Sequence, residues 1–565
     1  MDATLDCTAT CCPQEPPTWS RRGVAEKMAQ FTTLDSPWLS CRQIAGQLDV
    51  PARTLHHWMR RERALIENSS WPKSVARFLE TPGGLDFLHR LFTAAHLVFV
   101  QANDCGLRNL SWFLELSGLD EFIAPSYGAQ QAVAEEMESL LIRFGQEEDQ
   151  RLARQMSPQE ITLCEDETFH PQICLVAIEP VSNFILVEQY QPQRDAETWN
   201  QCVNAKLAGL PVTVCQVTSD AAKALIAHAE VCLGVHHSPD LFHVQYDTVQ
   251  ATSFALASRT RAAVTELEKA QRHTATLKEH HDASCEESPQ NPLVSVLEQH
   301  LQKAEAAEAA ARQQIDTCQT RQERAQAARQ GLGHDYHPVD LETGQPLTAG
   351  EVGQRLAGHF DTLDQVAVEA GLSAHAREKL AKARRVLDSM RATIAFFWTM
   401  IATRLAAWQF SPAVGQWLRQ DLIPVYYLYR VAEKANTAQE RQRLRALAAE
   451  VLARARSPDG LWGTFRPDLQ ADLESKARQC ADFFQRSSSC VEGRNGQLSL
   501  KHHALHQLTG RKLQALTVLH DYAVSRDDGS TPAGRFYGAA PRDLFPWLLA
   551  HLSLPARPRA VRRSA

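Results

Sequence analysis

Short apolar runs between residues 156 and 249 predict a small β-sheet. The first three runs cover residues 161–163, 173–178 and 184–187, and they are separated by Pro171, Pro180 and Asn183, which are typical of tight turns. A helical stretch over residues 195–207 follows, then a strand from residue 212, a helix over 221–229 and a last strand near 235–244. The predicted order is therefore three antiparallel strands followed by two strands with helical connections.

The chain before the predicted sheet has a helical pattern. Residues 40–61 predict a short helix, a turn at Asp49 and Val50, and a second helix that begins near Pro51, which together indicate a helix-turn-helix. Its apolar positions are Ile44, Ala45, Leu48, Val50, Leu55 and Trp58. The outer face of its second helix carries Arg53, Thr54, His57 and Arg60. A plain helical hairpin is the alternative, but an arginine-rich outer face favours contact with the major groove of DNA.

The chain after the predicted sheet is also helical. Residues 250–330 are rich in Ala, Glu, Gln, Lys and Arg, and they predict two long helices in an antiparallel hairpin. Residues 331–480 predict an all-α insertion, and we assign its many aromatic residues chiefly to its core. We therefore expect an α/β core that is interrupted by a large all-α insertion and preceded by a helical DNA-binding domain.

These patterns divide the chain into eight segments. They are a disordered N-terminus (1–20), a helix-turn-helix domain (21–75), a helical linker domain (76–155), the first part of the α/β core (156–249), a long helical hairpin (250–330), an all-α insertion (331–480), the last part of the core (481–540) and a basic C-terminal tail (541–565).

Composition adds limits on location and chemistry. The 565 residues are 44% hydrophobic and 22% charged, which is typical of a soluble protein with several domains. We find neither a long apolar run nor a secretory signal, so we predict no membrane span and a cytoplasmic location. The net charge of −7 argues mildly against nucleic acid, although arginines gather in residues 42–63 and 557–563. Cys7, Cys11 and Cys12 lack a second ligand pair at zinc spacing.

Three acidic residues carry the candidate chemistry. Asp166 lies in the first predicted strand, Asp220 directly follows the fourth, and Glu492 begins a predicted helix much later in the chain. Carboxylates held close together repel each other and normally bind a cation. Mg²⁺ ions held by such oxygens activate an attacking oxygen and stabilise a leaving oxygen at a phosphodiester. The simpler interpretations are a helix cap for Asp220 and, for Asp166 with Glu165 and Glu167, a solvated strand edge.

With these acids in this order, the chain resembles the DDE-type transposases of prokaryotic insertion sequences. That family has an RNase H-like catalytic domain with a helical insertion before its final glutamate. Asp166, Asp220 and Glu492 match the three acids of the family. The resemblance implies that they are catalytic residues and metal ligands, with Mg²⁺, or Mn²⁺ in its place, as the cofactor. It also implies nicking of double-stranded DNA at element ends, strand transfer into target DNA, and a homodimer or larger assembly.

The resemblance extends to other positions. Asp240 and His243, in the sequence Asp-Leu-Phe-His, match a C/D-x-x-H motif of hAT and Mutator-like relatives and are expected near the site. Trp462 is similar to a tryptophan that holds a flipped base in such enzymes. Arg494 and Lys501 follow Glu492, and we expect them to contact DNA phosphates. The alternatives are a packed core histidine at position 243 and an ordinary solvated helix face for the two basic residues.

Two further functions stay open at this point. One is an RNase H-like nuclease that cuts DNA without joining it. The other is a regulator, domesticated from a transposase, that binds DNA through its N-terminal helices without chemistry. The three intact acids argue against the regulator, and inverted repeats on both sides of the gene would argue for the transposase.

Overall fold

The computed structural model describes residues 19–558 apart from residues 36, 104, 288–291 and 506–507. The chain forms two compact units. The terminal unit contains Met1–Gln155 and Leu500–Ala565, and the central unit contains Met156–Ser499. The segment 481–540, expected as the last part of the core, is therefore divided, since its residues from Leu500 onward pack in the terminal unit. The cysteines at positions 7, 11 and 12, nearly all of the N-terminal segment 1–20 and the end of the tail lie outside the described residues.

The terminal unit is entirely helical in its described part. Its elements are α1 (Arg21–Leu34), α2 (Cys41–Gln47), α3 (Ala52–Asn68), α4 (Lys73–Phe78), α5 (Pro82–Ala95), η1 (His96–Ala102), α6 (Leu107–Leu116), η2 (Leu119–Glu121), α7 (Tyr127–Ala153), α20 (Gly510–Ala523), α21 (Pro532–Tyr537) and α22 (Leu544–His551). Helix α22 lies within the segment expected as a basic tail. Its Trp547 packs edge-on against Phe144 of α7, so the chain there is part of the hydrophobic core.

Helices α1 to α3 form a helix-turn-helix around a small core of their own. Ser40 begins α2 with a capping box, in which its hydroxyl and the Gln43 side chain satisfy each other's backbone N–H groups. Asp49 has a φ of 53° and makes the turn into α3. The apolar positions named from the sequence, together with Phe31, form the buried cluster between the three helices. Burial of this seam leaves the polar positions of α3 on the outside.

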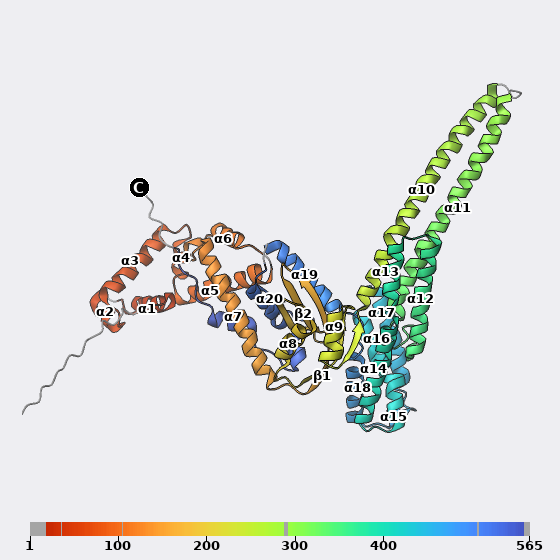
Figure 1. The fold of residues 1–565 in the computed structure, drawn as a ribbon. Helices are drawn as coiled ribbons and strands as arrows, with labels where there is room; N and C mark the ends of the chain where they lie inside the picture. Colours follow the sequence, from red (N-terminus) through yellow and green to blue (C-terminus); the bar gives the residue numbers. More distant parts are fainter. Residues whose placement is uncertain (1–18, 36, 104, 288–291, 506–507, 559–565) are drawn as a thin grey trace, which may run out of the picture. The chain divides into compact units, whose positions relative to one another are not determined.

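The central unit contains a five-stranded mixed sheet (Figure 1). Its strands are β1 (Gln159–Phe169), β2 (Ile173–Glu179), β3 (Phe184–Gln191), β4 (Val212–Ser219) and β5 (His236–Pro239), in the order β3-β2-β1-β4-β5. The first three strands are antiparallel neighbours, whereas β4 runs parallel to β1 and β5 runs parallel to β4. The crossovers are made by α8 (Ala196–Leu207) and by α9 (Lys223–Ala227) with η3 (His228–Cys232). A small α/β core with helical connections therefore follows the predicted order.

Helices make up the rest of the central unit. They are α10 (Leu241–Glu287), α11 (Pro292–Asp335), α12 (Ala349–Glu369), α13 (Ala374–Arg384), α14 (Leu387–Ala407), α15 (Pro412–Trp417), η4 (Leu418–Leu422), α16 (Ile423–Glu433), α17 (Ala438–Ala455), η5 (Leu461–Thr464), α18 (Pro467–Asp482) and α19 (Ser489–Leu505), the last of which runs on into the terminal unit. The last strand is shorter than expected, because Pro239 ends it and α10 begins two residues later.

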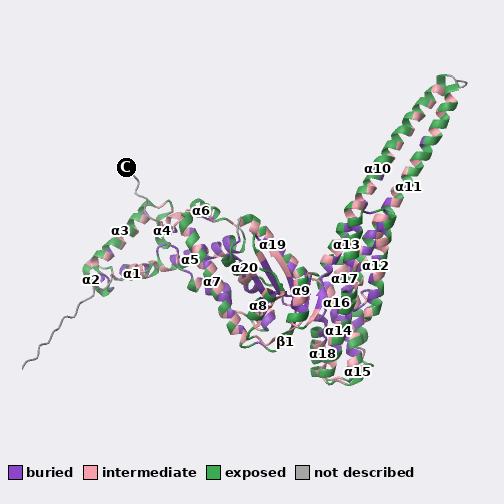
Figure 2. Ribbon diagram, in the orientation of Figure 1, coloured by how far each residue is buried: buried purple, intermediate pink, exposed green. Residues whose placement is uncertain are grey.

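Burial separates two parts of this helical region. The aromatic residues of α14 and α16, including Phe397 and Tyr427, lie in the core of the bundle. The buried residues of α10 end at Ala263 and those of α11 begin at Ala304, so the described residues in the far part of the hairpin are only half-buried or exposed (Figure 2). In the residues that the structure describes, none of the helices has the length and apolarity needed to cross a membrane.

Candidate metal centre

The pleat of β1 decides which of its three consecutive acids faces the site. Side chains alternate between the two faces of a strand. Glu165 lies on one face, where it accepts a hydrogen bond from His228 Nδ1 at 3.0 Å. Glu167 shares that face and pairs with Arg194. Asp166 therefore lies on the opposite face, and it approaches α19 and the beginning of α10.

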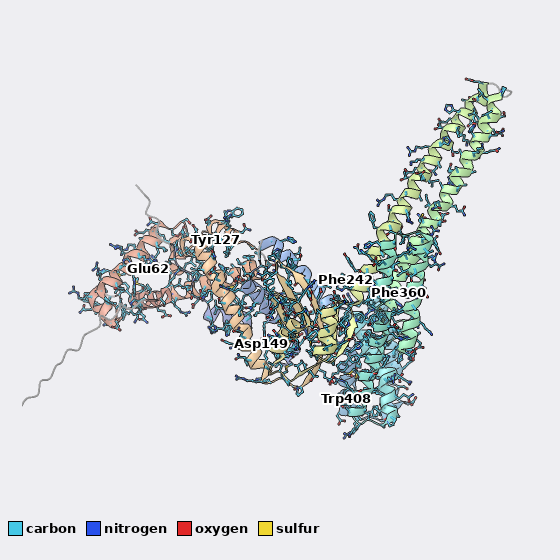
Figure 3. All side chains as sticks on the ribbon, viewed as in Figure 1. Glu62, Tyr127, Asp149, Phe242, Phe360 and Trp408 are labelled. Carbon is cyan, nitrogen blue, oxygen red and sulfur yellow. The ribbon has the colours of Figure 1, made fainter. Side chains whose placement is uncertain are left out.

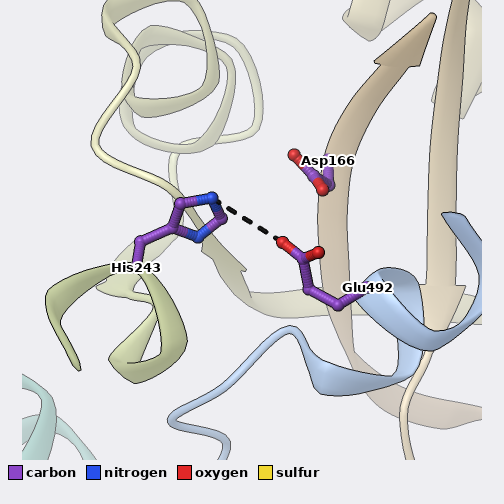
Figure 4. Close-up of side chains that lie close together, drawn as sticks. All are labelled: Asp166, His243 and Glu492. Carbon is purple, nitrogen blue, oxygen red and sulfur yellow. Dashed lines mark ion pairs between the residues drawn. The ribbon is translucent and has the colours of Figure 1, made fainter. Parts of the chain in front are cut away.

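Asp166, His243 and Glu492 come together from β1, α10 and α19. One ligand atom from each of these side chains lies within 4.8 Å of the others. His243 Nε2 lies 3.6 Å from Glu492 Oε1, and both side chains face Asp166 (Figure 4). Each of the three is partly exposed, so solvent or a substrate can reach the group. Two of the three predicted acids and the predicted near-site histidine thus share one site.

Asp240 is a buried carboxylate that orients His243 and contacts the backbone next to the site. Its Oδ2 accepts a hydrogen bond from His243 Nδ1 at 2.7 Å, and its Oδ1 accepts the backbone N–H groups of Phe242 and Ser488 at 3.0 and 2.9 Å. Its own N–H donates to the carbonyl of Ser219, the last residue of β4. A single buried carboxylate therefore ties the start of α10 to the segment that leads into α19. The two predicted near-site residues are joined as an aspartate–histidine pair.

The charges at this site shift each other's pKa values. Burial, together with the nearby carboxylates of Glu492 and Asp220, raises the pKa of Asp166 to about 7. Burial also raises the pKa of Glu492. The hydrogen bond to Asp240 raises the pKa of His243 to about 9 in spite of burial. The carboxylates favour the charged form of His243 and disfavour each other's charged forms. These shifts indicate a site with an excess of negative charge.

Asp220 lies beside this group without joining it. It follows β4 directly, and its Oδ1 accepts the backbone N–H of Ala222 at 2.9 Å. Its charge raises the pKa values of Asp166 and Glu492, which places it within electrostatic reach of both. The interpretation of Asp220 as a capping residue therefore accounts for its Oδ1. Its second carboxylate oxygen is not used by this cap, and the residue lies close enough to Asp166 and Glu492 to affect their pKa values.

Asn495 is a site residue whose contact with Asp166 was not predicted from the sequence. It lies one helical turn after Glu492, and its Nδ2 donates to Asp166 Oδ2 at 2.8 Å. Its Oδ1 is buried and has no hydrogen-bond partner among the described residues. The amide therefore orients Asp166 and offers a further oxygen close to the carboxylates. The spacing of three residues from Glu492 was the available signal, because positions i and i+3 share one face of a helix.

Arg494 corrects one of the sequence-based assignments. Its guanidinium is buried and makes two hydrogen bonds of 2.6 Å with the carboxylate of Glu188 on β3. This bidentate pair occupies the N–H groups of the guanidinium that would otherwise bind a phosphate. Arg494 therefore anchors α19 to the sheet, and a contact with DNA is not assigned to it.

Lys501 and Trp462 are not members of the group formed by Asp166, His243 and Glu492. Lys501 belongs to the terminal unit, where its Nζ donates to the carbonyl of Ala102 at 2.9 Å. Trp462 lies in η5, with its ring 6.0 Å from that of Trp417 and with Arg456 above it at 5.3 Å. The contacts of Trp462 with Trp417 and Arg456 are internal to the helical region, so packing explains the presence of a tryptophan at this position.

The outer face of α3 is arranged as the sequence predicts. Arg53, His57 and Arg60 are exposed, and Thr54 is half-buried. Their exposure follows from the burial of Leu55 on the other side of the same helix. This face belongs to the terminal unit, whereas the acidic group belongs to the central unit.

The side chains at the acidic group fit a divalent cation. Carboxylate oxygens suit Mg²⁺ and Mn²⁺, and both Asp166 and Glu492 supply them. His243 donates its Nδ1–H to Asp240 and, in the cationic form that this bond favours, carries a proton on Nε2 as well, so it adds a nitrogen ligand only where a metal displaces that proton.

Comparison with known proteins adds one match. The model of a family of unknown function, DUF6399, matches residues 418–564. That stretch includes Glu492 and Asn495, whereas Asp166, Asp220 and His243 precede it. No curated protein and no solved structure matches the chain. The function must therefore be argued from the site.

Proposed function

We propose that this protein is a metal-dependent enzyme that cuts and joins DNA in the manner of a DDE-type transposase. The observation that carries the proposal is the convergence of Asp166 and Glu492 with His243 on one face of the sheet. These residues come from segments separated by the whole helical insertion. Selection for stability alone would not bring two half-buried carboxylates together, because they repel each other.

The topology supports an RNase H-like assignment for the central unit. The resemblance implies three antiparallel strands, followed by two parallel strands reached through helices, with the acids on the first strand, after the fourth strand and on a late helix. Asp166 in β1, Asp220 after β4 and Glu492 in α19 occupy these positions. The helical region between β5 and α19 corresponds to the insertion that the resemblance implies.

The side chains divide the proposed chemistry among them. Asp166 and Glu492, together with Asp220 beside them, would hold a divalent cation. Mg²⁺ or Mn²⁺ bound there would activate the attacking oxygen and stabilise the leaving oxygen of a phosphodiester. Asp240 fixes the ring of His243, whose positive charge then faces the position of a phosphate. Asn495 holds Asp166 in one orientation.

The exposed face of α3 supports double-stranded DNA as the substrate. Arg53, Thr54, His57 and Arg60 present charged and polar groups on a helix that follows a tight turn, which is the arrangement that enters a major groove. Recognition of element ends and chemistry then belong to different units of the chain. Because two element ends must be processed together, we also propose a homodimer or larger assembly.

The test uses the full chain and a supercoiled plasmid that carries the DNA flanking the gene on both sides. With Mg²⁺ or Mn²⁺ we expect nicking at the element ends and a strand-transfer product in target DNA. Asp220→Asn should abolish both and leave binding of the ends intact. Asp388→Asn, at an exposed carboxylate of the same unit, is the matched control and should behave as wild type.

Each other outcome selects a different function. Released cuts without joined products would identify a nuclease. Binding of the ends without any cutting would identify a regulator. Equal nicking by Asp220→Asn and by wild type would contradict the assignment of this acid.

A further inference from the structure

An apolar patch is exposed on the terminal unit, where η1 and α6 meet. Its side chains are Phe99 of η1 and Trp112, Phe113 and Leu116 of α6. The rings of Phe99 and Phe113 meet edge-on with their centroids 6.2 Å apart, which joins the two elements into one surface. Trp112 is 61% exposed and Leu116 is 72% exposed, although Leu110 and Leu114 already supply α6 with a buried side. A helix that is apolar on two sides normally has a partner on each.

The size of the patch fits the centre of a protein interface. The exposed fractions of its four side chains correspond to roughly 400 Å² of apolar surface. A contiguous apolar surface of this size commonly marks a protein contact. A stable interface buries about 800 Å² on each partner and has an apolar centre within a polar rim. Tyr127, at the beginning of the neighbouring helix α7, is a further exposed ring of the same unit (labelled in Figure 3).

Two residues of opposite charge lie beside the patch on α6. Arg108 and Glu115 are exposed, and neither forms an ion pair with another residue that the structure describes. At about 100° per residue, Arg108 and Glu115 lie about 40° and 60° from Trp112 on one side, whereas Leu116 lies about 40° away on the other. The two charges are about two helical turns apart. The outer face of α6 therefore has an apolar edge and a charged edge, with a cation at one end of the charged edge and an anion at the other.

This outer face is complementary to itself. When a twofold axis relates two antiparallel α6 helices, like edges lie together, so the apolar edges meet and Arg108 lies opposite the partner's Glu115. That contact occurs twice, because both copies use the same surface. Trp112 lies near the midpoint between the two charges and thus close to the axis, in the centre of the contact. In a parallel pair Arg108 would face the partner's Arg108, and like charges weaken association. Charge therefore favours a second, antiparallel copy as the partner.

We propose that the patch on η1 and α6 is the interface through which two copies of this chain associate, with their α6 helices antiparallel. The inference rests on the homodimer of the proposed function, to which it assigns a surface. The interface belongs to the same unit as the helix-turn-helix. A dimer formed through it contains two copies of α3, so it can bind two DNA sites at once, as twofold-related helix-turn-helix proteins do.

The first experiment measures association of the full chain by sedimentation velocity, without DNA and over a series of concentrations. We expect wild type to form a dimer. Trp112→Ala should raise the dissociation constant of that dimer roughly thirtyfold or more, because both copies lose a tryptophan from the centre of the contact. Trp38→Ala, at a tryptophan of the same unit that is 90% exposed, is the matched control and should equal wild type. A wild-type chain that is monomeric at every concentration would overturn the proposal, and so would equal dissociation constants for Trp112→Ala and wild type.

Charge reversal tests whether the partner is an antiparallel copy. Arg108→Glu alone and Glu115→Arg alone should each weaken the dimer roughly tenfold, because each places like charges opposite one another at both contacts. An equal mixture of the two single variants should associate as tightly as wild type, since the mixed dimer has opposite charges at both contacts. The double variant should do the same. A mixture that associates no better than either variant alone would overturn the antiparallel pairing.

The interface and the enzyme assignment fail in different ways. If wild type nicks the plasmid but Trp112→Ala associates normally, the interface is wrong and the enzyme assignment stands. If wild type never nicks DNA but Trp112→Ala loses the dimer, the interface stands and the chemistry is wrong. Melting curves of every variant check the fold. A lower melting temperature of Trp112→Ala with unchanged association would mean that the patch packs against another part of the same chain, which also overturns the proposal.

Discussion

The two faces of β1 carry the same kinds of side chain in opposite surroundings. On one face Glu165 and His228 are both fully buried, 3.0 Å apart, with the ring of Trp199 stacked on the imidazole. On the other face His243 pairs with buried Asp240 and also faces Asp166 and Glu492, all three of which are partly open to solvent. One acid–histidine pair is closed by aromatic packing, and the other has additional carboxylates and an open side.

This difference separates a structural pair from a chemical one. A closed pair offers no room for a substrate, so its contribution is to the fold. An open pair with extra acids has negative charge that is unbalanced until a cation binds. Residue type therefore says little about role in this strand, whereas burial and the number of neighbouring charges say much.

Removal of a carboxylate on the open face should have the largest effect on function. We expect Asp166→Asn to reduce nicking roughly a thousandfold, because it removes a ligand of the cation that stabilises the reacting oxygens. Stability should not fall, since repulsion between Asp166 and Glu492 is relieved. Plasmid nicking and urea unfolding measure the two effects. Glu167→Gln, on the neighbouring residue, serves as the control, and a comparable loss there would remove the distinction between the faces.

The closed face should respond in the opposite way. We expect Glu165→Ala to lower the free energy of unfolding by roughly 3–5 kcal/mol, because His228 would stay buried without its carboxylate. Urea unfolding of the purified chain is the measurement. Glu167→Ala should cost less, about 1–2 kcal/mol, because it removes a pair with exposed Arg194 and one hydrogen bond from Trp199 Nε1. A small effect of Glu165→Ala would mean that the closed pair does not support the fold.

Asn495 tests whether the open face depends on orientation as well as charge. We expect Asn495→Ala to reduce nicking roughly tenfold to a hundredfold, since outer residues that orient metal ligands typically have effects of that size. The affinity for Mn²⁺, measured by calorimetry, should fall in parallel. Gln497→Ala, at an exposed position of the same helix, should change neither quantity. Unchanged Mn²⁺ affinity in Asn495→Ala would show that Asp166 needs no support from the amide.

The smallest effect concerns a third histidine, which has the opposite shift from His243. His236 stacks on Phe396 and is hydrogen-bonded to Thr393, and burial lowers its pKa to about 4. Between that value and about 6.5 the unfolded chain binds the proton first, so stability is complete above pH 6.5 and falls as the pH drops. We expect a slope of at most about 1.4 kcal/mol per pH unit from this residue.

His236→Gln isolates that slope, because glutamine keeps a hydrogen-bonding group and does not titrate. Urea unfolding at pH 5 and pH 7 should show a smaller difference for the variant than for wild type. Equal differences would mean that His236 is already protonated in the folded protein at pH 5.

Particular residues show how far the sequence could lead. Turn residues and apolar runs located all five strands and the two long helices, because these signals are local. Arg494 was assigned to phosphate from its position on the helix after Glu492, and the structure pairs it with Glu188 instead, through a contact between distant segments. The contact of Asn495 with Asp166 was not predicted for the same reason, since Asp166 lies far away in the chain. Trp462 matched by spacing, but its neighbours are Trp417 and Arg456.

The sequence by itself determined the order of the strands, the helix-turn-helix and its outer face, and the identity of the acids worth examining. Only the tertiary structure decided that Asp166, rather than Glu165 or Glu167, joins Glu492, and that the chain after residue 500 packs in the terminal unit. The physical reason is the range of the forces involved. Turns, caps and periodicity act within a few residues, whereas burial and the pairing of charges depend on which distant segments the fold brings together.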